Sequence, residues 1–289
     1  MSEFVTLTGD DLTARIKLKG AELCSLTGAA GTEIIWQAGP AWPRHAPILF
    51  PIVGKLAGDW LRHNGAVFHL TQHGFARDRV FTLVEASQDF ARFVLTDDEA
   101  TRALYPFAFR LDVIFQIKDS GLSITYQISN PGSVVLPASI GAHPAFCWPL
   151  TTNGAKSGYR LEFSDPEPAP IRRLKDGLLA PAHHPTPIRG RILALDEELF
   201  AADAIILDRL ASNWVRFTAE DAVPVVVAWE GFDTLGLWSK PGAPFLCIEP
   251  WKGFASPAAF DGEFAAKPGL MHIPPGESRS ASYTIKLGA

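Results

Sequence analysis

The sequence predicts an all-β protein, a large antiparallel β-sandwich with a few short helices. Apolar and polar residues alternate over many short segments, which is the pattern of strands with one buried face. Turn signals separate these segments roughly every 8–12 residues, as in sandwiches and barrels. Segments with helical periodicity are few and short. We therefore expect residues 1–289 to form a single β-sandwich domain.

Strand signals run through the first half of the chain. Residues 14–19 alternate apolar and basic side chains. The segments 60–63 and 66–70 flank Asn64-Gly65, a pair that suits the two positive φ angles of a type I′ hairpin turn. Further strands are predicted at 79–84, 91–96, 112–117, 122–128 and 134–140.

The second half repeats this pattern with longer connections. Strands are predicted at 160–163, 204–207, 214–218, 223–229, 234–238, 245–249 and 281–287. Short helices are predicted near 98–104, 196–202 and 257–265. Residues 150–157 and 165–191 are rich in proline and glycine, so we predict loops there.

Composition argues against several classes of protein. The net charge is −5 without a basic stripe, so no nucleic-acid partner is expected. No apolar run approaches the roughly 20 residues of a membrane-spanning helix, and the N-terminus lacks the apolar core of a secretory signal. Cys24, Cys147 and Cys247 have no metal-type spacing, so reduced thiols in the cytoplasm are expected. A mature secreted form stays open on this ground.

Glu249 is the first candidate for chemistry. It follows an apolar run and shares the parity of Phe245 and Cys247, so in a strand it points with them toward an interior or a pocket. Pro250 is expected to end the strand pairing, and Trp251 to form a wall of the site. A carboxyl group in this setting is a candidate for a raised pKa and for proton transfer. The alternative is a strand-end carboxylate that exits to solvent.

Two histidines follow predicted strands. His73 precedes Gly74, which lets other groups approach the backbone closely. His143 precedes Pro144, which restricts the histidine to extended geometry. Small residues and Phe146 surround His143, as in a sugar-binding pocket. The alternatives are a structural role for His73 in a charged turn and a buried His143 bonded to a carbonyl.

Lys55, Arg77 and Asp208 are candidates for ligand contacts. Lys55 lies near two glycines, where an ammonium can donate to a hydroxyl or a phosphate. Arg77 adds a cation to the loop of His73, and Asp208 follows a predicted strand. The alternatives are a solvated turn lysine, an arginine paired with a neighbouring acid and an ordinary turn aspartate. The motifs GxGxxG, GxxxxGK[ST], GxSxG and HExxH do not occur.

Three motifs considered together indicate a family. They are His-Gly-Phe-Ala-Arg at 73–77, His-Pro-Ala-Phe at 143–146 and Cys-Ile-Glu-Pro-Trp at 247–251, with Pro-Ile-Val-Gly-Lys at 51–55 upstream. The ordered set resembles the aldose 1-epimerase (galactose mutarotase-like) family, in particular a divergent bacterial branch that includes hexose-phosphate mutarotases. The resemblance extends over nearly the whole chain and implies a large antiparallel β-sandwich.

The resemblance also implies roles for the candidate residues. Glu249 matches the general base, and His143 matches the general acid. His73 matches a second histidine that binds and polarises the sugar. Lys55 stands where better-characterised members carry arginine in an Asn-Arg-Ile motif, so a point charge replaces a bidentate fork. Asp208 is matched to a substrate-binding aspartate.

The implied reaction interconverts the α and β anomers of an aldohexose or hexose phosphate. The base removes the proton of the C1 hydroxyl, the acid protonates the ring oxygen, and the opened ring recloses on its other face. An acid and a base on opposite sides of the pyranose suffice, and no cofactor is expected. The expected state, an ionised Glu249 beside a protonated His143, predicts a pH optimum near or below neutral. Arg77 has no counterpart in the galactose-specific members and, with Lys55, is a candidate for a phosphate contact.

Two other functions stay open. The first is a non-catalytic carbohydrate-binding or sugar-sensing protein, which the replacement at Lys55 motivates. The second is a metalloenzyme in which His73, His143 and Glu249 form a facial triad of metal ligands. The expected partner is a small-molecule sugar or sugar phosphate, and the expected assembly is a monomer or a weak homodimer.

Overall fold

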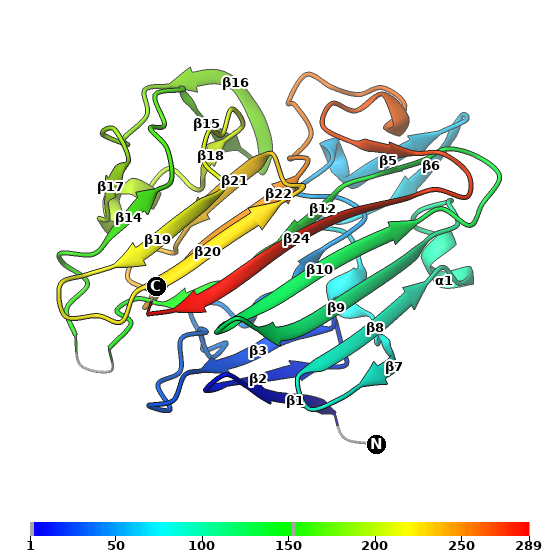
Figure 1. Cartoon of the computed structure of the whole chain (residues 1–289). Helices are drawn as coiled ribbons and strands as arrows, with labels where there is room; N and C mark the ends of the chain where they lie inside the picture. Colours follow the sequence, from blue (N-terminus) through cyan, green and yellow to red (C-terminus); the bar gives the residue numbers. More distant parts are fainter. Residues whose placement is uncertain (1–2, 152–153, 289) are drawn as a thin grey trace.

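The protein is a β-sandwich of two large antiparallel sheets, described by a computed structural model for residues 3–151 and 154–288. The nine-stranded sheet crosses the view in Figure 1, and strands of an eight-stranded sheet pass behind it. The nine-stranded sheet has the order β17 (Ile192–Ala194), β14 (Arg160–Phe163), β19 (Trp214–Thr218), β20 (Val225–Glu230), β24 (Ser278–Leu287), β10 (Gly121–Ser129), β9 (Arg110–Lys118), β8 (Phe90–Thr96) and β7 (Thr82–Ala86). The predicted fold class is confirmed.

The eight-stranded sheet carries the candidate functional site. Its order is β16 (Leu178–His184), β15 (Ile171–Lys175), β18 (Ile205–Leu207), β21 (Thr234–Trp238), β22 (Phe245–Lys252), β12 (Ile140–Ala142) and β4 (Ile48–Leu49), and β13 (Ala145–Cys147) also pairs with β22. Smaller sheets consist of β1 (Phe4–Gly9), β2 (Leu12–Lys17) and β3 (Glu22–Thr27), of β5 (Trp60–His63) and β6 (Ala66–His69), and of β11 (Leu136–Ala138) and β23 (Met271–Ile273).

Helical segments are short. They are α1 (Glu99–Arg102) and the 3-10 helices η1 (Ala57–Asp59), η2 (Ala76–Asp78), η3 (Glu197–Phe200) and η4 (Phe264–Ala266). Helix α1 begins after Asp98, which forms a capping box with Thr101. The helices predicted near 98–104 and 196–202 correspond to α1 and η3, whereas 257–265 contains only the first residues of η4. In the part of the chain that the structure covers, no helix is long and apolar enough to cross a membrane.

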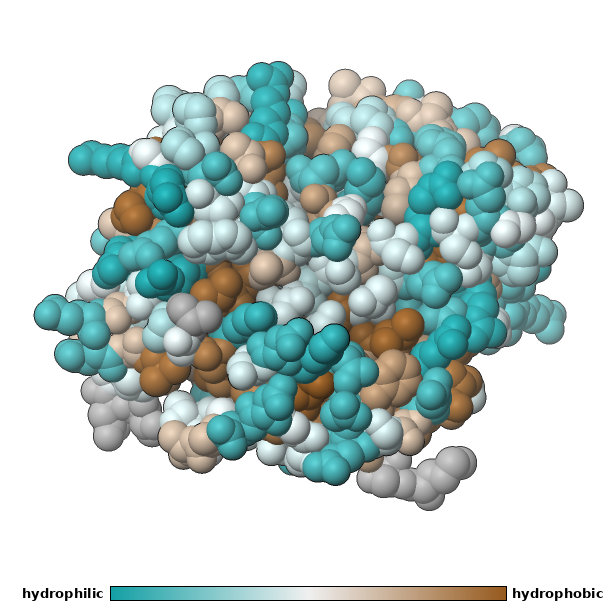
Figure 2. All heavy atoms as spheres, in the orientation of Figure 1, coloured by the Kyte–Doolittle hydropathy of each residue, from teal (hydrophilic) through white to brown (hydrophobic). Residues whose placement is uncertain are grey.

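The period-two alternation places one face of each sheet in the core. In β10, for example, Leu122, Ile124, Tyr126 and Ile128 are buried while the intervening side chains are partly exposed. Hydrophilic side chains are correspondingly interspersed with hydrophobic ones over the face seen in Figure 2. Burial of these apolar rows between the two sheets is the main driving force for the fold.

Several predicted elements are corrected by the structure. The predicted loop 165–191 contains the hairpin of β15 and β16, because Asp176 and Gly177 adopt the positive φ angles of a tight turn. The predicted strand 134–140 is divided into β11 and β12. Pro250 does not end its strand: β22 continues to Lys252, since pairing with β21 persists through this position. Of the predicted loop 150–157, residues 152–153 lie outside the described residues.

Candidate active site

A cavity of about 290 Å³ lies on the outer face of the eight-stranded sheet. Along β22, Leu246 and Ile248 pack into the main core, whereas Phe245 and Cys247 belong to a separate cluster with tryptophan side chains. Glu249 continues the second row and lines the cavity, so its predicted parity is confirmed. The aromatic walls of the cavity are Trp42, Trp238 and Trp251. Its polar lining consists of Gln72, His73, Arg77, His143, Asp203 and Glu249.

The register of β22 brings His143 opposite Glu249. Ala145 of β13 lies across from Cys247, and β12 continues the same antiparallel register on the other side of the histidine. Residue 143 therefore lies opposite residue 249 in this register. The Nε2 atom of His143 is 3.3 Å from Oε2 of Glu249. Strand pairing thus joins two residues that are far apart in the sequence.

This adjacency corrects the expectation of an acid and a base on opposite sides of the sugar. A separation of 3.3 Å between Nε2 and Oε2 leaves no room for a ring between His143 and Glu249. Neighbouring groups nevertheless suit ring opening, because the C1 hydroxyl oxygen and the ring oxygen are bonded to the same carbon. One residue can face each oxygen from the same wall of the cavity.

Burial also determines the charge of this pair. Glu249 is 1% exposed, and burial raises the pKa of its carboxyl group well above 4.5. Burial, together with the Arg77 guanidinium, lowers the pKa of His143 to about 3. Both shifts favour neutral groups, with the proton on Glu249, whereas the sequence led us to expect an ionised Glu249 and a protonated His143. Either form carries one proton, so the two residues titrate as a pair.

His73 is held in a defined tautomer beside His143. The centroids of the two imidazole rings are 5.7 Å apart, and the ring planes are at 82°. The Nδ1 atom of His73 accepts a hydrogen bond of 3.1 Å from the N–H of Gly54, and the His73 N–H donates to Gly54 O at 2.8 Å. Burial lowers the pKa of His73 well below 6.5, so the ring is neutral. Its proton must then reside on Nε2, which is therefore a donor and lies 3.3 Å from the side-chain amide of Gln72, another residue that lines the cavity.

Gly54 is required for this arrangement. Its φ angle is +72°, and a Cβ atom at this position would lie 2.5 Å from the Cβ of Ala255. Glycine therefore allows the 51–55 segment to approach both His73 and the cavity wall at Ala255.

Arg77 supplies positive charge to the cavity. Its Nη2 donates to Gln72 O at 2.7 Å, and its Nε lies 3.8 Å from Asp78 Oδ2. The same carboxylate accepts a hydrogen bond of 3.1 Å from Arg44. Two guanidinium groups thus share one carboxylate. Burial lowers the pKa of Arg77 to about 10, which still leaves the side chain charged at neutral pH.

Asp203 lines the cavity, whereas the predicted ligand Asp208 does not belong to its lining. The two aspartates flank opposite ends of β18. Asp203 accepts a hydrogen bond from the N–H of Ala204 at 2.7 Å, while Asp208 forms an ion pair with Arg172 at 3.0 Å. The sequence placed an aspartate at each end of this strand, and strand direction decides which one reaches the site.

Lys55 also lies outside the cavity lining. Its Nζ is 3.9 Å from Asp59 Oδ2, and a Cβ atom at Gly177 would lie 3.1 Å from the Cδ of the lysine stem. The lysine therefore packs against the β15–β16 hairpin. Sequence reasoning missed Trp42, which lies in a loop without a recognisable signal, and Trp238, the last residue of a correctly predicted strand.

Among the residues that the structure describes, two groups of side chains have the spacing of metal ligands. Beside the cavity, one ligand atom each of His143, Cys247 and Glu249 lies within 4.8 Å of the others, and His73 is not part of this group. Burial raises the pKa of the Cys247 thiol and of the Glu249 carboxyl group, so the protonated forms compete with any metal ion.

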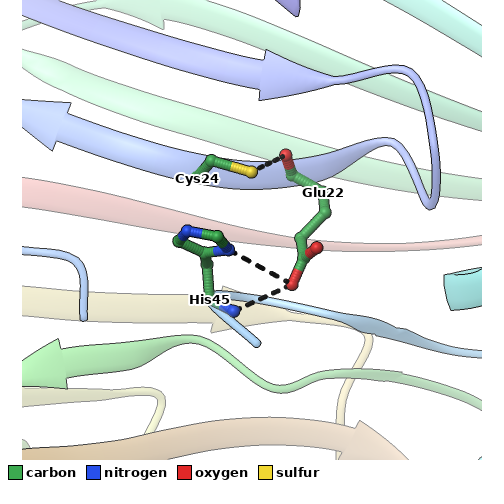
Figure 3. A group of neighbouring side chains, drawn as sticks. All are labelled: Glu22, Cys24 and His45. Carbon is green, nitrogen blue, oxygen red and sulfur yellow. Dashed lines mark hydrogen bonds and ion pairs between the residues drawn. The ribbon is translucent and has the colours of Figure 1, made fainter. Parts of the chain in front are cut away.

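The second group is Glu22, Cys24 and His45, shown in Figure 3. The Glu22 carboxylate accepts hydrogen bonds from Lys17 Nζ at 2.8 Å and from the backbone N–H of His45 at 2.9 Å. The thiol of Cys24 donates to Glu22 O at 3.3 Å, and burial raises its pKa to about 12. These bonds already occupy the carboxylate, which indicates a structural role. Cys24, Cys147 and Cys247 are all free, as expected for reduced thiols.

Comparison with known proteins identifies the family. A family model described as aldose 1-epimerase matches residues 3–286. The chain belongs to the aldose 1-epimerase family. Protein LacX, chromosomal, of Lactococcus lactis subsp. lactis is 32% identical over 296 residues, covering 98% of this chain and 99% of LacX. The predicted family is thereby confirmed, and the aldose 1-epimerases are a family of isomerases.

Solved structures agree with this assignment. The galactose mutarotase related enzyme of Lactobacillus acidophilus is 31% identical, with a TM-score of 0.92 over 99% of this chain and 97% of that one. A galactose mutarotase-like protein of Lactobacillus casei is 28% identical, with a TM-score of 0.91 over 98% and 99% of the two chains. A putative aldose 1-epimerase of Escherichia coli, at 16% identity and a TM-score of 0.72, shares the fold.

Proposed function

We propose that this aldose 1-epimerase family member is a sugar mutarotase, in which His143 and Glu249 exchange protons with the anomeric centre. The observation that carries the proposal is the 3.3 Å approach of Nε2 and Oε2 in a cavity lined by polar groups and three tryptophans. One group protonates the ring oxygen while the other takes the proton of the C1 hydroxyl. The C1–O5 bond breaks, an aldehyde and a C5 hydroxyl form, and rotation about C1–C2 precedes reclosure.

The neutral form of the pair defines which residue donates a proton and which accepts one. In that form the Glu249 carboxylic acid gives its proton to the ring oxygen, and His143 Nε2 accepts the hydroxyl proton. The resemblance assigns the opposite roles, with Glu249 as base and His143 as acid, and these belong to the ion-pair form. Both routes begin with one proton on the pair and end with one proton on it, so reclosure restores the starting state.

The remaining polar groups suit the hydroxyl groups of one monosaccharide. A cavity of about 290 Å³ is of the size of a small-molecule site. His73 offers an N–H donor, and Asp203 offers a carboxylate acceptor at the cavity. Trp238 and Trp251 supply apolar faces for the C–H side of a sugar ring.

Arg77 favours an anionic sugar as substrate. It shares one carboxylate with Arg44, so the arginine side of the cavity carries excess positive charge. A guanidinium at such a position suits a phosphate group. We therefore propose a hexose phosphate as the preferred substrate, with the free aldohexose as a weaker one.

The defining experiment is NMR exchange spectroscopy of pure anomers of glucose, galactose and their 6-phosphates with and without the protein. Mutarotation that is faster than in buffer for one of them, at catalytic amounts of protein, supports the proposal. Saturable sugar binding with anomer exchange no faster than in buffer would instead establish the second candidate, a non-catalytic carbohydrate-binding protein. The position of Lys55 outside the cavity lining is the observation that favours this alternative.

A further inference from the structure

The loop of residues 36–45 crosses the site beside His143. Both of its ends are hydrogen-bonded to Ala145, two residues after the histidine. The N–H of Trp36 donates to Ala145 O at 2.9 Å, and the N–H of Ala145 donates to His45 O at 2.9 Å. The loop is therefore fixed to the same strand, β13, that follows His143 in the chain.

Further bonds hold the loop in place. At its far end, the Glu22 carboxylate of Figure 3 accepts hydrogen bonds from the N–H groups of His45 and Ala46, at 2.9 and 3.3 Å. Within the loop, the indole N–H of Trp36, its first residue, donates to Trp42 O at 2.8 Å. The position of Trp42 is thus defined by bonds that do not involve a ligand.

The Trp42 side chain packs on His143. The ring centroids are 4.9 Å apart, and the planes are at 26°, a stacked arrangement. Trp238 and His73 approach the same imidazole edge-on, at 6.0 Å and 86° and at 5.7 Å and 82°. Phe245 stacks on Trp42 at 5.6 Å and 30°. The imidazole is therefore held by aromatic rings.

Aromatic contacts, in place of a hydrogen bond from another residue to Nδ1, orient the ring of His143. A histidine that transfers protons is commonly oriented by a bond at its second ring nitrogen. The Nδ1 atom of His143 is buried, and no other residue that the structure describes hydrogen-bonds to it. Rotation of the ring about its Cβ–Cγ bond is consequently limited by packing, and Trp42 provides the stacked face.

We propose that Trp42 is a positioning residue, which holds the His143 ring with Nε2 toward Glu249 and closes one of its faces to water. The proposal rests on the proposed mutarotase function for its catalytic consequence, but its effect on His143 exists in the free protein. The loop 36–45 is then a fixed part of the proton-transfer site, and the residues that anchor it contribute to the geometry of the pair.

The experiment is an NMR titration of the His143 imidazole in the full-length, ligand-free protein, for wild type, Trp42→Ala, Trp42→Leu and Trp42→Phe. Since burial is the main cause of the low pKa of His143, about 3, opening the face in Trp42→Ala should raise this pKa by about one unit or more. Trp42→Phe retains a stacked ring and should leave the pKa within about half a unit of wild type. Trp60→Ala, which removes a tryptophan that is 48% exposed on β5, is the matched control and should have no effect on His143.

A kinetic comparison separates positioning from folding. Trp42→Leu keeps an apolar side chain over His143 but removes the stacked face, so kcat should fall about 10-fold or more while KM changes less than about 3-fold. Circular dichroism establishes that each variant is folded. An unchanged His143 pKa in folded Trp42→Ala, or a wild-type kcat in folded Trp42→Leu, would overturn the proposal. If wild type binds sugars without turnover, the proposed function fails, and the titration still decides the effect of Trp42 on His143.

Discussion

His143 and Glu249 face each other across the register of β13, β12 and β22, with Nε2 of the histidine 3.3 Å from Oε2 of the glutamate. Both side chains are buried, which favours the neutral form of each. In the proposed reaction, the pair can therefore hold a single mobile proton beside the anomeric carbon without a metal ion in the scheme. The first predictions concern this proton.

Replacement of the carboxyl group should abolish most of the catalysis. Glu249→Gln preserves the shape of the side chain but cannot give or take a proton, and we expect kcat to fall about 10²–10⁴-fold. The measurement is anomer exchange by NMR on the best substrate. Because His143 and Glu249 act together, His143→Asn should lose a similar amount, and the double variant should lose little more. A Glu249→Gln enzyme as fast as wild type would remove Glu249 from the mechanism.

The pH–rate profile should show a broad plateau. The pair gains a second proton only when His143 is protonated, near pH 3, and loses its last proton only above the raised pKa of Glu249. The rate should therefore fall as the pH decreases toward 3 and again as it rises through the pKa of Glu249. The measurement is kcat/KM as a function of pH. An acid limb near 6.5, the ordinary value of histidine, would contradict the neutral pair.

The free energy of unfolding should also decrease as Glu249 loses its proton at rising pH. The folded-state pKa of Glu249 is raised, so the stability that this carboxyl contributes is full below about 4.5 and is lost as the pH rises through its folded pKa. Glu249→Gln should therefore lose less stability than wild type on going to alkaline pH. Thermal melts of both proteins over a pH series test this, and parallel curves would show that Glu249 does not titrate in the expected range.

His73 should remain a neutral Nε2–H tautomer at neutral pH. The Gly54 N–H donates to Nδ1, and burial lowers the pKa of His73 well below 6.5. Long-range ¹H–¹⁵N NMR of labelled protein identifies the tautomer directly. A proton on Nδ1 in the free protein would be incompatible with the Gly54 bond.

The two aspartates beside β18 should behave differently. Asp203→Asn removes a carboxylate at the cavity and should raise KM about 10-fold without a loss of stability. Asp208→Asn is the matched change at the other end of the strand. It breaks the ion pair with Arg172 and should cost about 1–3 kcal/mol of unfolding free energy while KM stays near wild type. Steady-state kinetics and denaturant melts of both variants check this, and the reverse pattern would restore Asp208 as the ligand contact.

Arg77 should distinguish phosphorylated from free sugars. Loss of a charge-assisted contact to phosphate is worth about 1.5–3 kcal/mol, so Arg77→Ala should raise KM for glucose 6-phosphate about 10–100-fold and change KM for glucose much less. Arg62→Ala, an exposed arginine on β5, is the control. An equal loss on both substrates would argue against a phosphate contact at Arg77.

Some of this protein can be predicted from its sequence because the relevant signals are local. Alternation of apolar and polar residues predicted the strands β14, β19 and β21 with their observed bounds. The Asn64-Gly65 pair predicted a hairpin turn, and its φ angles are +50° and +77°. Period-two parity also placed Glu249 on the side of Phe245 and Cys247, since it depends only on neighbours along one strand.

The tertiary structure decided which of the candidate residues meet. Whether Asp203 or Asp208 reaches the cavity depends on the direction in which β18 enters the sheet, and Lys55 lies outside the lining with its stem beside the β15–β16 hairpin. Trp42 reaches His143 because the 36–45 loop is bonded at both ends to Ala145. Such placements arise from pairing and packing between distant segments, which a local pattern does not encode. The sequence determined many of the strands and the parity of Glu249, while long-range strand register placed His143 opposite it, and burial in that position determined the charge of the pair.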